Sequence, residues 1–270
     1  GTPWKNRGSE FYSILNMIDP MKFSSYAAYL RRWVTYYAQG NQWKEGGIRD
    51  IPAFKEYIRD IAIRREVDEV FKEMPEVNRT IFTCDLDEFA RQQYESEISE
   101  FVRKQNQRII DGTDDTGSMD AVGDLNRVRH IVALNKIPVT VEWVREFYEN
   151  ADDKIVVFVH HIDVGQILYE TLKKDFPDVP ILQITGSMSA EEKFNAQTKF
   201  NDTKKCFMVA STLAAGEGLN LQTCCTAIMH ERQWNPANED QAAPGRFRRI
   251  GQTRNMNIVF ITAKNTTDDF

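Results

Sequence analysis

The chain has 270 residues, 41% of them hydrophobic, and a formal net charge of −6 at pH 7. This composition supports one large or two compact folded units and excludes a disordered chain. The acidic balance argues against indiscriminate nucleic-acid binding, so any contact with DNA must come from local patches. The four cysteines show no Cys-x-x-Cys spacing, and no apolar run approaches the roughly 18 residues that a membrane span needs. We therefore expect a reduced, intracellular protein of the cytoplasm or of the nucleoid or nucleus, with no membrane partner.

The first half of the chain favours helices. Aromatic residues and paired charges predict helices at residues 9–18, 21–38, 52–73, 87–110 and 125–150. A single strand is expected at Asn78–Cys84. Residues 111–123 are small and acidic and include glycine, which predicts a flexible loop between units.

The second half alternates between strands and helices. Several short runs are apolar on both faces, the pattern of parallel strands covered by helices: Ile155–Val159, Ile181–Ile184, Phe207–Ala210, Ala227–Met229 and Ile258–Ile261. Ser189 followed by Glu192 is a capping-box signature for one of the intervening helices. The pattern predicts an open α/β sheet, in which ligands bind beyond the carboxyl ends of the strands.

The segment that follows the strand at 207–210 is typical of a phosphate contact. Ser211 and Thr212 offer hydroxyl groups and backbone amides at a strand end, which positions a nucleic-acid backbone without reading its sequence. Gly216 and Gly218 let the main chain approach a ligand closely. An ordinary glycine-rich turn has the same composition, so the segment gains weight only from the arginines found further along the chain.

Residues 234–252 hold the second candidate site. Arg246 and Arg249 are three residues apart, which on a helix places them on one face, behind the polar Gln241. Two guanidinium groups on one face suit an anion with several oxygens, such as a triphosphate. A solvated basic helix end is the competing interpretation of the arginine pair alone. No zinc-type ligand spacing occurs in the chain, so we expect no metal site.

Together these segments resemble motifs five and six of the Swi/Snf-like ATPases in helicase superfamily two. Motif five is matched by Ser211–Leu221, and motif six by Trp234-Asn235-Pro236-Ala237 with Arg246-Phe247-Arg248-Arg249-Ile250-Gly251-Gln252. Lys154–His161 resembles the family's motif four, and Gly1-Thr2-Pro3 resembles the end of motif three. The residues around Lys136-Ile137-Pro138 are most similar to the annealing-helicase branch.

The resemblance implies a domain organisation and an activity. It implies a C-terminal RecA-like lobe, lobe two, at residues 125–270, with a parallel sheet flanked by helices. The tail of lobe one with a mostly helical insertion would occupy residues 1–88, and a connecting helix and acidic loop residues 89–124. The family uses ATP, with Mg²⁺, to move along double-stranded DNA, and the resemblance implies catalytic arginine fingers at Arg246 and Arg249.

The resemblance also implies binding residues. Nucleotide-binding roles fall on Gly216, Gly218, Asn220 and Gln241, and contacts with the DNA backbone on Ser211, Thr212, His160 and Thr2. One departure from the family pattern concerns Gln241, because an extra residue near Pro244 separates it from Arg246. Either the helix that carries the arginines begins near Pro244, where a proline is tolerated, or Gln241 is displaced from its usual role.

The sequence contains no Gly-x-x-x-x-Gly-Lys-Ser/Thr motif, so it has no P-loop to hold phosphates. Both ends of the chain look like cuts through a longer protein. We therefore expect a monomer that hydrolyses no ATP alone and that works with a missing N-terminal helicase lobe, which would hold most of the ATP and Mg²⁺. Two alternatives stay open: a non-catalytic helicase-like module that binds DNA or a protein, and an RNA helicase of the same superfamily.

Overall fold

The computed structural model describes residues 7–39, 42–65, 67–71, 73–111, 119–215 and 218–269. The chain divides into two compact units, one formed by residues 1–70 and 104–118 and the other by residues 71–103 and 119–270. Each unit contains a hydrophobic core of its own.

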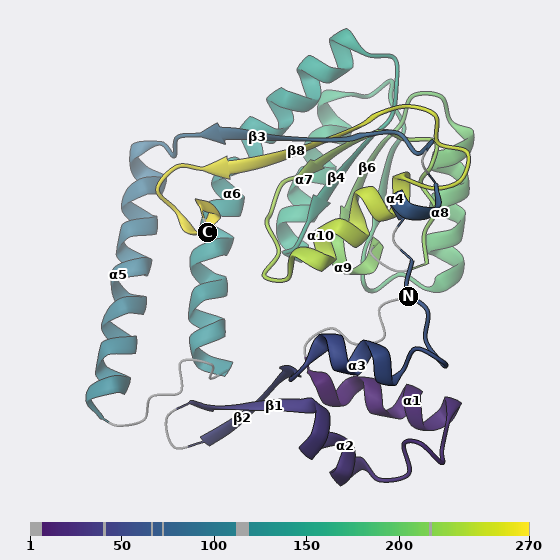
Figure 1. Cartoon of the computed structure of the whole chain (residues 1–270). Coiled ribbons are helices and arrows are strands. Elements are labelled where there is room, and N and C mark those ends of the chain that lie inside the picture. The colour runs from purple at the N-terminus through teal and green to yellow at the C-terminus, as the bar shows by residue number, and fades with distance from the viewer. Residues whose placement is uncertain are drawn as a thin grey trace. The chain divides into compact units, whose positions relative to one another are not determined.

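The larger unit is built on a parallel sheet of six strands in the order β3-β8-β7-β4-β6-β5 (Figure 1). The strands are β3 (Val77–Cys84), β4 (Ile155–Val159), β5 (Ile181–Ile184), β6 (Phe207–Ser211), β7 (Thr226–Met229) and β8 (Met256–Ala263). Every strand expected from the sequence is present, with small differences at the ends. The predicted α/β class, with a parallel sheet flanked by helices, is confirmed.

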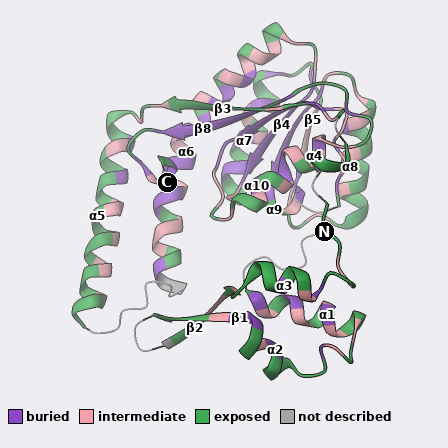
Figure 2. Ribbon diagram, viewed as in Figure 1, coloured by how far each residue is buried: buried purple, intermediate pink, exposed green. Residues whose placement is uncertain are grey.

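Helices cover both faces of this sheet. On one face, α6 (Met119–Asn150) and α7 (Ile162–Asp175) bury residues such as Val144 and Leu168 against the strands. The core of the other face takes Phe200, Ala215, Ala242 and Phe247 from a second layer of helices: α8 (Ala190–Asp202), α9 (Thr212–Ala215), α10 (Pro236–Ala242) and α11 (Pro244–Phe247). Figure 2 shows β4 buried along its length, whereas β3 is exposed at the edge of the sheet.

The smaller unit combines short helices with an antiparallel hairpin. Its elements are η1 (Gly8–Phe11), α1 (Tyr12–Ile18), α2 (Tyr26–Trp33), β1 (Val34–Gln39), β2 (Gln42–Ile48), α3 (Ile51–Tyr57) and α4 (Val67–Val70). Aromatic residues form its core, with Phe11, Tyr29, Trp33 and Phe54 buried together. The mostly helical segment expected before the sheet is therefore present.

Three expected boundaries are wrong. The helix expected at 21–38 ends at Trp33, because the β-branched and aromatic residues of Val34–Gln39 pair with β2 instead. The helix expected at 52–73 ends at Tyr57, and only the four residues of α4 return to helix. The loop expected at 111–123 is helical from Met119 onward, while its residues 112–118 lie outside the described residues.

The helix expected at 87–110 is present as α5 (Glu88–Ile110). No helix within the described residues is both long and apolar enough to cross a membrane.

Candidate functional site

The carboxyl ends of β4 and β6 bring Ser211 and Thr212 beside Val159. Ser211 is the last residue of β6 and pairs with Val159 in the ladder. Thr212 is buried, and its hydroxyl donates to the Val159 carbonyl oxygen at 3.0 Å. The Thr212 hydroxyl thus closes the turn into α9, whereas Ser211 is only half-buried.

His160 follows Val159 at the same edge of the sheet. Its backbone N–H donates to Oε1 of Glu231 at 2.7 Å. Among the described residues, its Nδ1 atom is buried without a hydrogen-bond partner. Burial lowers the pKa of His160, an effect only partly opposed by the nearby charge of Glu231. The side chain as a whole is half-buried.

The helical face expected to carry both arginines does not form. α11 begins at Pro244, as one of the two sequence interpretations predicts, but it ends at Phe247. Arg248 leaves the helix with φ −80° and ψ 72°, so Arg249 lies in the bend that follows. The expectation that Arg246 and Arg249 share one helical face is wrong, because Pro244 restarts the helix only four residues before the chain turns away.

Arg246 nevertheless lies against the segment that leads into β7. Its carbonyl oxygen accepts the backbone N–H of Leu221 at 3.0 Å, and its Nη1 donates to the Leu219 carbonyl at 3.4 Å. Arg249 stays close by, because its Nε donates to the Gly245 carbonyl at 3.3 Å. Both arginines are half-buried. The structure therefore brings the arginine segment onto residues 219–221.

Asn220 and Gly218 lie on the segment before β7 that Arg246 contacts. The Asn220 backbone N–H donates to Oε1 of Gln197 at 2.6 Å, and its carbonyl accepts Nδ2 of Asn201 at 3.0 Å. Gly218 has φ +79°, in the left-handed region that favours glycine. A Cβ atom at this position would meet no other heavy atom within 4 Å. Gln241 is half-buried on α10, a separate helix from α11. Gly216 and Thr2 lie outside the described residues.

The sequence-predicted residues thus fall into two groups. His160, Ser211 and Thr212 lie at the carboxyl ends of β4 and β6. Gly218, Asn220 and Arg246 lie along the segment that enters β7 from its amino end. No group of three or more histidine, cysteine, aspartate or glutamate residues suited to a metal ion occurs in the part of the chain that the structure describes.

Sequence reasoning missed a charged cluster at the carboxyl ends of β4 and β7. Glu231 is buried and accepts hydrogen bonds from the N–H groups of His160 and His161. Burial alone would raise the pKa of Glu231, but the hydrogen bond from His161 and the nearby histidines lower it to about 2. The available signal was that polar residues follow two apolar strand runs, at 160–161 and at 230–231.

Trp234 extends this edge of the sheet. Its side chain is 58% exposed, although the guanidinium of Arg129 lies over its ring at 4.5 Å from the centroid. The indole N–H donates to Oδ1 of Asn126 at 3.5 Å. α6, which carries both partners, therefore fixes the orientation of an exposed aromatic ring.

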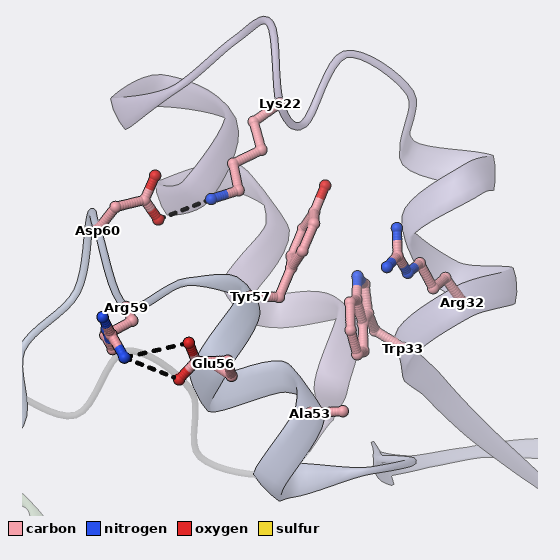
Figure 3. Close-up of a pocket in the computed structure, with 8 residues that line it drawn as sticks. All are labelled: Lys22, Arg32, Trp33, Ala53, Glu56, Tyr57, Arg59 and Asp60. Carbon is pink, nitrogen blue, oxygen red and sulfur yellow. Dashed lines mark hydrogen bonds and ion pairs between the residues drawn. The ribbon is translucent and has the colours of Figure 1, made fainter.

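The smaller unit carries a hollow lined by Lys22, Arg32, Trp33, Ala53, Glu56, Tyr57, Arg59 and Asp60 (Figure 3). Most of its charged groups already have partners inside the hollow. Lys22 pairs with Asp60 at 2.6 Å. Arg59 pairs with Glu56 at 3.1 Å. The guanidinium of Arg32 stacks on Tyr57 at 4.5 Å. None of these residues is one to which the sequence assigns a role.

Comparison with known families and proteins supports the resemblance to the Swi/Snf-like ATPases independently of the fold. Residues 1–137 match the SNF2-related domain, and residues 139–251 match the helicase conserved C-terminal domain. The DNA annealing helicase and endonuclease ZRANB3 of Homo sapiens is 26% identical over 99% of this chain and 25% of its own length. The SWI/SNF-related matrix-associated actin-dependent regulator of chromatin subfamily A-like protein 1 of Xenopus tropicalis is 27% identical over 100% of this chain and 28% of its own. The chain thus spans about a quarter of the length of such relatives.

Solved structures share the fold. The Sulfolobus solfataricus SWI2/SNF2 ATPase core in complex with dsDNA superposes with a TM-score of 0.58, covering 96% of this chain and 56% of that one at 20% identity. The C-terminal part of the Fun30 ATPase domain gives a TM-score of 0.59, covering 73% of this chain and 87% of that one at 17% identity. At these identities the likeness concerns the fold alone.

Proposed function

Because this chain belongs to the SNF2-related family, we propose that it is the C-terminal part of an ATP-driven translocase that moves along double-stranded DNA. We further propose lobe two at residues 125–270, with β3 added to its sheet, after a helical insertion within residues 1–88 and a connecting segment at 89–124. The P-loop would come from a lobe that this sequence does not contain. The 270-residue chain alone would then hydrolyse no ATP.

The observation that carries this proposal is the contact between the arginine segment and residues 219–221. Arg246 is tied to Leu219 and Leu221 through both its main chain and its side chain. Arg249 is held beside it through the Gly245 carbonyl. Two half-buried guanidinium groups, each held in place by its own hydrogen bond, are preorganised donors for an anion.

The residues present fit the phosphates of ATP. The guanidinium groups of Arg246 and Arg249 suit an anion with several oxygens, and Gly218 leaves open space beside the backbone for its approach. The metal ion that accompanies the nucleotide would neutralise developing charge on the phosphates. We assign it to the other lobe, as the family resemblance implies.

For the DNA, we propose contacts at the carboxyl ends of β4 and β6. The half-buried Ser211 offers its hydroxyl, and Thr212 offers its backbone N–H, since its hydroxyl is engaged with Val159. His160 and Thr2 complete the set that the family pattern suggests. Such contacts address phosphate and sugar rather than base edges, which is what movement along any sequence requires.

The experiment is a DNA-stimulated ATPase assay on the full-length protein that contains this chain. Replacement of Arg249 by alanine removes a charge aimed at the transferred phosphoryl group, and losses of about 10³-fold or more are typical of arginine fingers. We therefore expect Arg249→Ala and Arg246→Ala to reduce kcat strongly while duplex DNA still binds. The matched control is Arg145→Ala, which removes a surface guanidinium on α6 that pairs with Glu142 of the same helix and Asp175 of α7.

Normal ATP hydrolysis by Arg249→Ala would show that the finger assignment is wrong. Comparing duplex DNA with RNA as the stimulating polymer tests the substrate, and stimulation by RNA alone would replace the duplex-DNA proposal. Equal loss of activity in Arg145→Ala would mean that the arginine substitutions act through stability.

A further inference from the structure

A cluster of imidazoles and carboxylates occupies the carboxyl ends of β4 and β7 without a role in the function proposed above. His130 comes from α6, His161 from the N-cap position of α7, Asp163 from the first turn of α7, and Glu231 from the segment after β7. His160 and His230 adjoin it, so all the histidines of the chain lie at this edge of the sheet.

Glu231 organises the turn between β4 and α7. The ladder between β4 and β7 ends where the His230 N–H donates to the Phe158 carbonyl at 3.0 Å. Beyond it, Oε1 of Glu231 accepts the backbone N–H groups of His160 and His161, at 2.7 and 3.0 Å. Oε2 accepts Nδ1–H of His161 at 2.5 Å. One buried carboxylate thus fixes both the backbone of the turn and the ring of His161.

This arrangement also fixes the tautomer of His161. An ionised carboxylate can only accept hydrogen bonds, so Nδ1 carries the proton and Nε2 is left facing away from Glu231. Among the described residues, Nε2 of His161 has no hydrogen-bond partner, and the side chain keeps 18% of its surface exposed. Protonation of His161 would therefore place a new N–H donor at the surface while Glu231 balances the charge.

His130 repeats this arrangement on the neighbouring helix. Its Nε2 lies 2.6 Å from Oδ2 of Asp163, and its ring centroid lies 4.8 Å from that of His161. Nδ1 of His130 has no hydrogen-bond partner among the described residues, and 30% of the side chain is exposed. Two imidazoles, each anchored by a carboxylate through one nitrogen, thus stand next to each other with the second nitrogen available.

A buried arginine behind the pair provides a separate observation that points to a polar ligand. Arg129 is only 8% exposed, and within the described residues its Nη1 has no hydrogen-bond partner. Nδ1 of His160 and Nε2 of Gln233 are buried next to each other. Native interiors rarely leave a buried guanidinium nitrogen unsatisfied. Arg129 therefore supplies a donor that the protein itself does not use.

We propose that His161 and His130 bind a non-bridging phosphate oxygen of the DNA backbone, and that Glu231 is the positioning residue that holds His161 ready for it. The inference rests on the proposed function and refines it, because it adds two imidazoles to the half-buried His160, the histidine that the family pattern suggests. Protonated imidazoles donate charge-assisted hydrogen bonds to phosphate.

The location favours the DNA backbone over a nucleotide as the source of the phosphate. Ser211, a proposed DNA contact, ends the strand next to β4 and pairs with Val159, two residues before His161. Arg246, the proposed nucleotide contact, is tied to Leu219 and Leu221 on the segment that enters β7 from its amino end. The imidazole pair thus extends the proposed DNA contacts at the carboxyl ends of β4 and β6. It is separate from the proposed nucleotide contacts before β7.

The charged groups around the pair set the expected response to pH. α6 contributes Arg129, His130 and Lys136; the turn after β4 contributes His160; α7 contributes Asp163; and the segment after β7 contributes His230 and Glu231. Imidazole ordinarily gains its proton between pH 8 and 5. Only the protonated ring can donate from both of its nitrogens, one to the carboxylate and one to the phosphate, so affinity for DNA rises as pH falls through this range.

The test measures duplex-DNA affinity of the full-length protein by fluorescence anisotropy at pH 8 and pH 6, at constant ionic strength. A charge-assisted hydrogen bond corresponds to roughly tenfold in affinity. We expect the wild type to bind roughly tenfold more tightly at pH 6 than at pH 8, and His161→Gln and His130→Gln to lose most of this gain.

Glu231→Gln separates positioning from direct contact. It keeps the size of the side chain and an acceptor for the backbone N–H groups, but its amide nitrogen replaces the acceptor Oε2 and donates to Nδ1 of His161. The proton of the neutral ring then lies on Nε2 at either pH, so the rise in affinity between pH 8 and pH 6 should be smaller than in the wild type. Lys174→Gln is the matched control, because it removes an exposed charge at the far end of α7 and should leave the pH response unchanged.

Several outcomes would overturn the inference. A wild type that binds duplex DNA in a salt-sensitive way, but with the same pH response as His161→Gln, would refute the imidazole contact while leaving the proposed function intact. Absence of duplex-DNA binding at any pH would refute both. If His161→Gln changed affinity for ATP in the absence of DNA and left DNA binding unaltered, the phosphate would be that of the nucleotide and the DNA assignment would be wrong.

Discussion

His230 is a buried histidine whose hydrogen bonds fit the neutral imidazole. Its Nε2 lies 3.0 Å from the Ala133 carbonyl, which can only accept, so the proton is on Nε2. Nδ1 then accepts from the Thr140 hydroxyl at 2.7 Å. Burial, assisted by the charge of Lys136, lowers the pKa of His230 from 6.5 to about 3.

This pKa predicts a loss of stability in mild acid. Between pH 6.5 and about 3 the unfolded chain binds a proton at His230 and the folded chain does not. The contribution of neutral His230 to the free energy of unfolding is therefore fully present above pH 6.5 and is lost as pH falls towards 3. The loss between pH 7 and pH 5 should be about 2 kcal/mol. Urea unfolding of the wild type and His230→Asn at both values measures it. The variant is less stable throughout, but its pH dependence should be smaller by that amount; an undiminished dependence would contradict the assignment.

At the scale of elements, a buried ion pair fastens α6 to the end of the sheet. Nζ of Lys136 lies 2.5 Å from Oδ2 of Asp268, in the short helix η2 (Thr267–Asp269), and donates to the Ile261 carbonyl of β8 at 2.8 Å. Both side chains are buried. We expect Asp268→Asn to lower the free energy of unfolding by about 3–5 kcal/mol, because it leaves a buried ammonium without its counter-charge.

A double variant and an exposed pair complete this test. Lys136→Met combined with Asp268→Asn removes both charges and should recover much of the loss, since a well-packed apolar replacement of a buried pair is often neutral. Lys264 and Asp85 form an exposed pair at 3.1 Å. Asp85→Asn should therefore change stability by less than about 1 kcal/mol. Equal effects of Asp85→Asn and Asp268→Asn in chemical denaturation would argue against the burial effect.

Elements with a clear periodicity could be predicted from the sequence. The buried strands such as Ile155–Val159 are short and apolar on both faces, which is the pattern of a covered parallel sheet. Val34–Gln39 was predicted as helix because local charge and aromatic content resemble the preceding turns, yet pairing with Gln42–Ile48 wins. Only the start of α11 could be predicted from the sequence, because Pro244 indicates where a helix begins but not that it ends at Phe247.

The candidate site could be predicted where its residues are neighbours in sequence and could not where strand order joins them. Ser211 ends β6 and Thr212 follows it directly, so the sequence predicts that both lie at the carboxyl end of that strand. Glu231 and His161 are brought together only because β7 lies next to β4, an order that apolar patterns do not encode. The same order separates Ser211 from Arg246, although the loop between Ser211 and Leu221 is short.

At the scale of the whole molecule, the net charge of −6 sets how DNA binding should respond to salt. An acidic chain gains nothing from its overall field, so affinity must depend on a few local phosphate contacts. Each neutralised phosphate lowers the logarithm of the binding constant by about 0.9 per tenfold rise in salt. The one phosphate that His130 and His161 are proposed to share predicts about a 3.5-fold loss of affinity between 50 and 200 mM salt, and further phosphate contacts add to it.

Both the size and the origin of the slope of log binding constant against log salt concentration can be tested with the full-length protein. Salt is titrated at pH 6 and DNA binding is measured by fluorescence anisotropy. Removing both imidazole charges in the double variant His130→Gln/His161→Gln should reduce the slope by about one phosphate contact. Lys174→Gln should leave it unchanged, because that charge lies at the opposite end of α7. A wild-type affinity that is flat across this range would rule out phosphate contacts as the source of binding, and an equal slope in the double variant would place the contacts elsewhere.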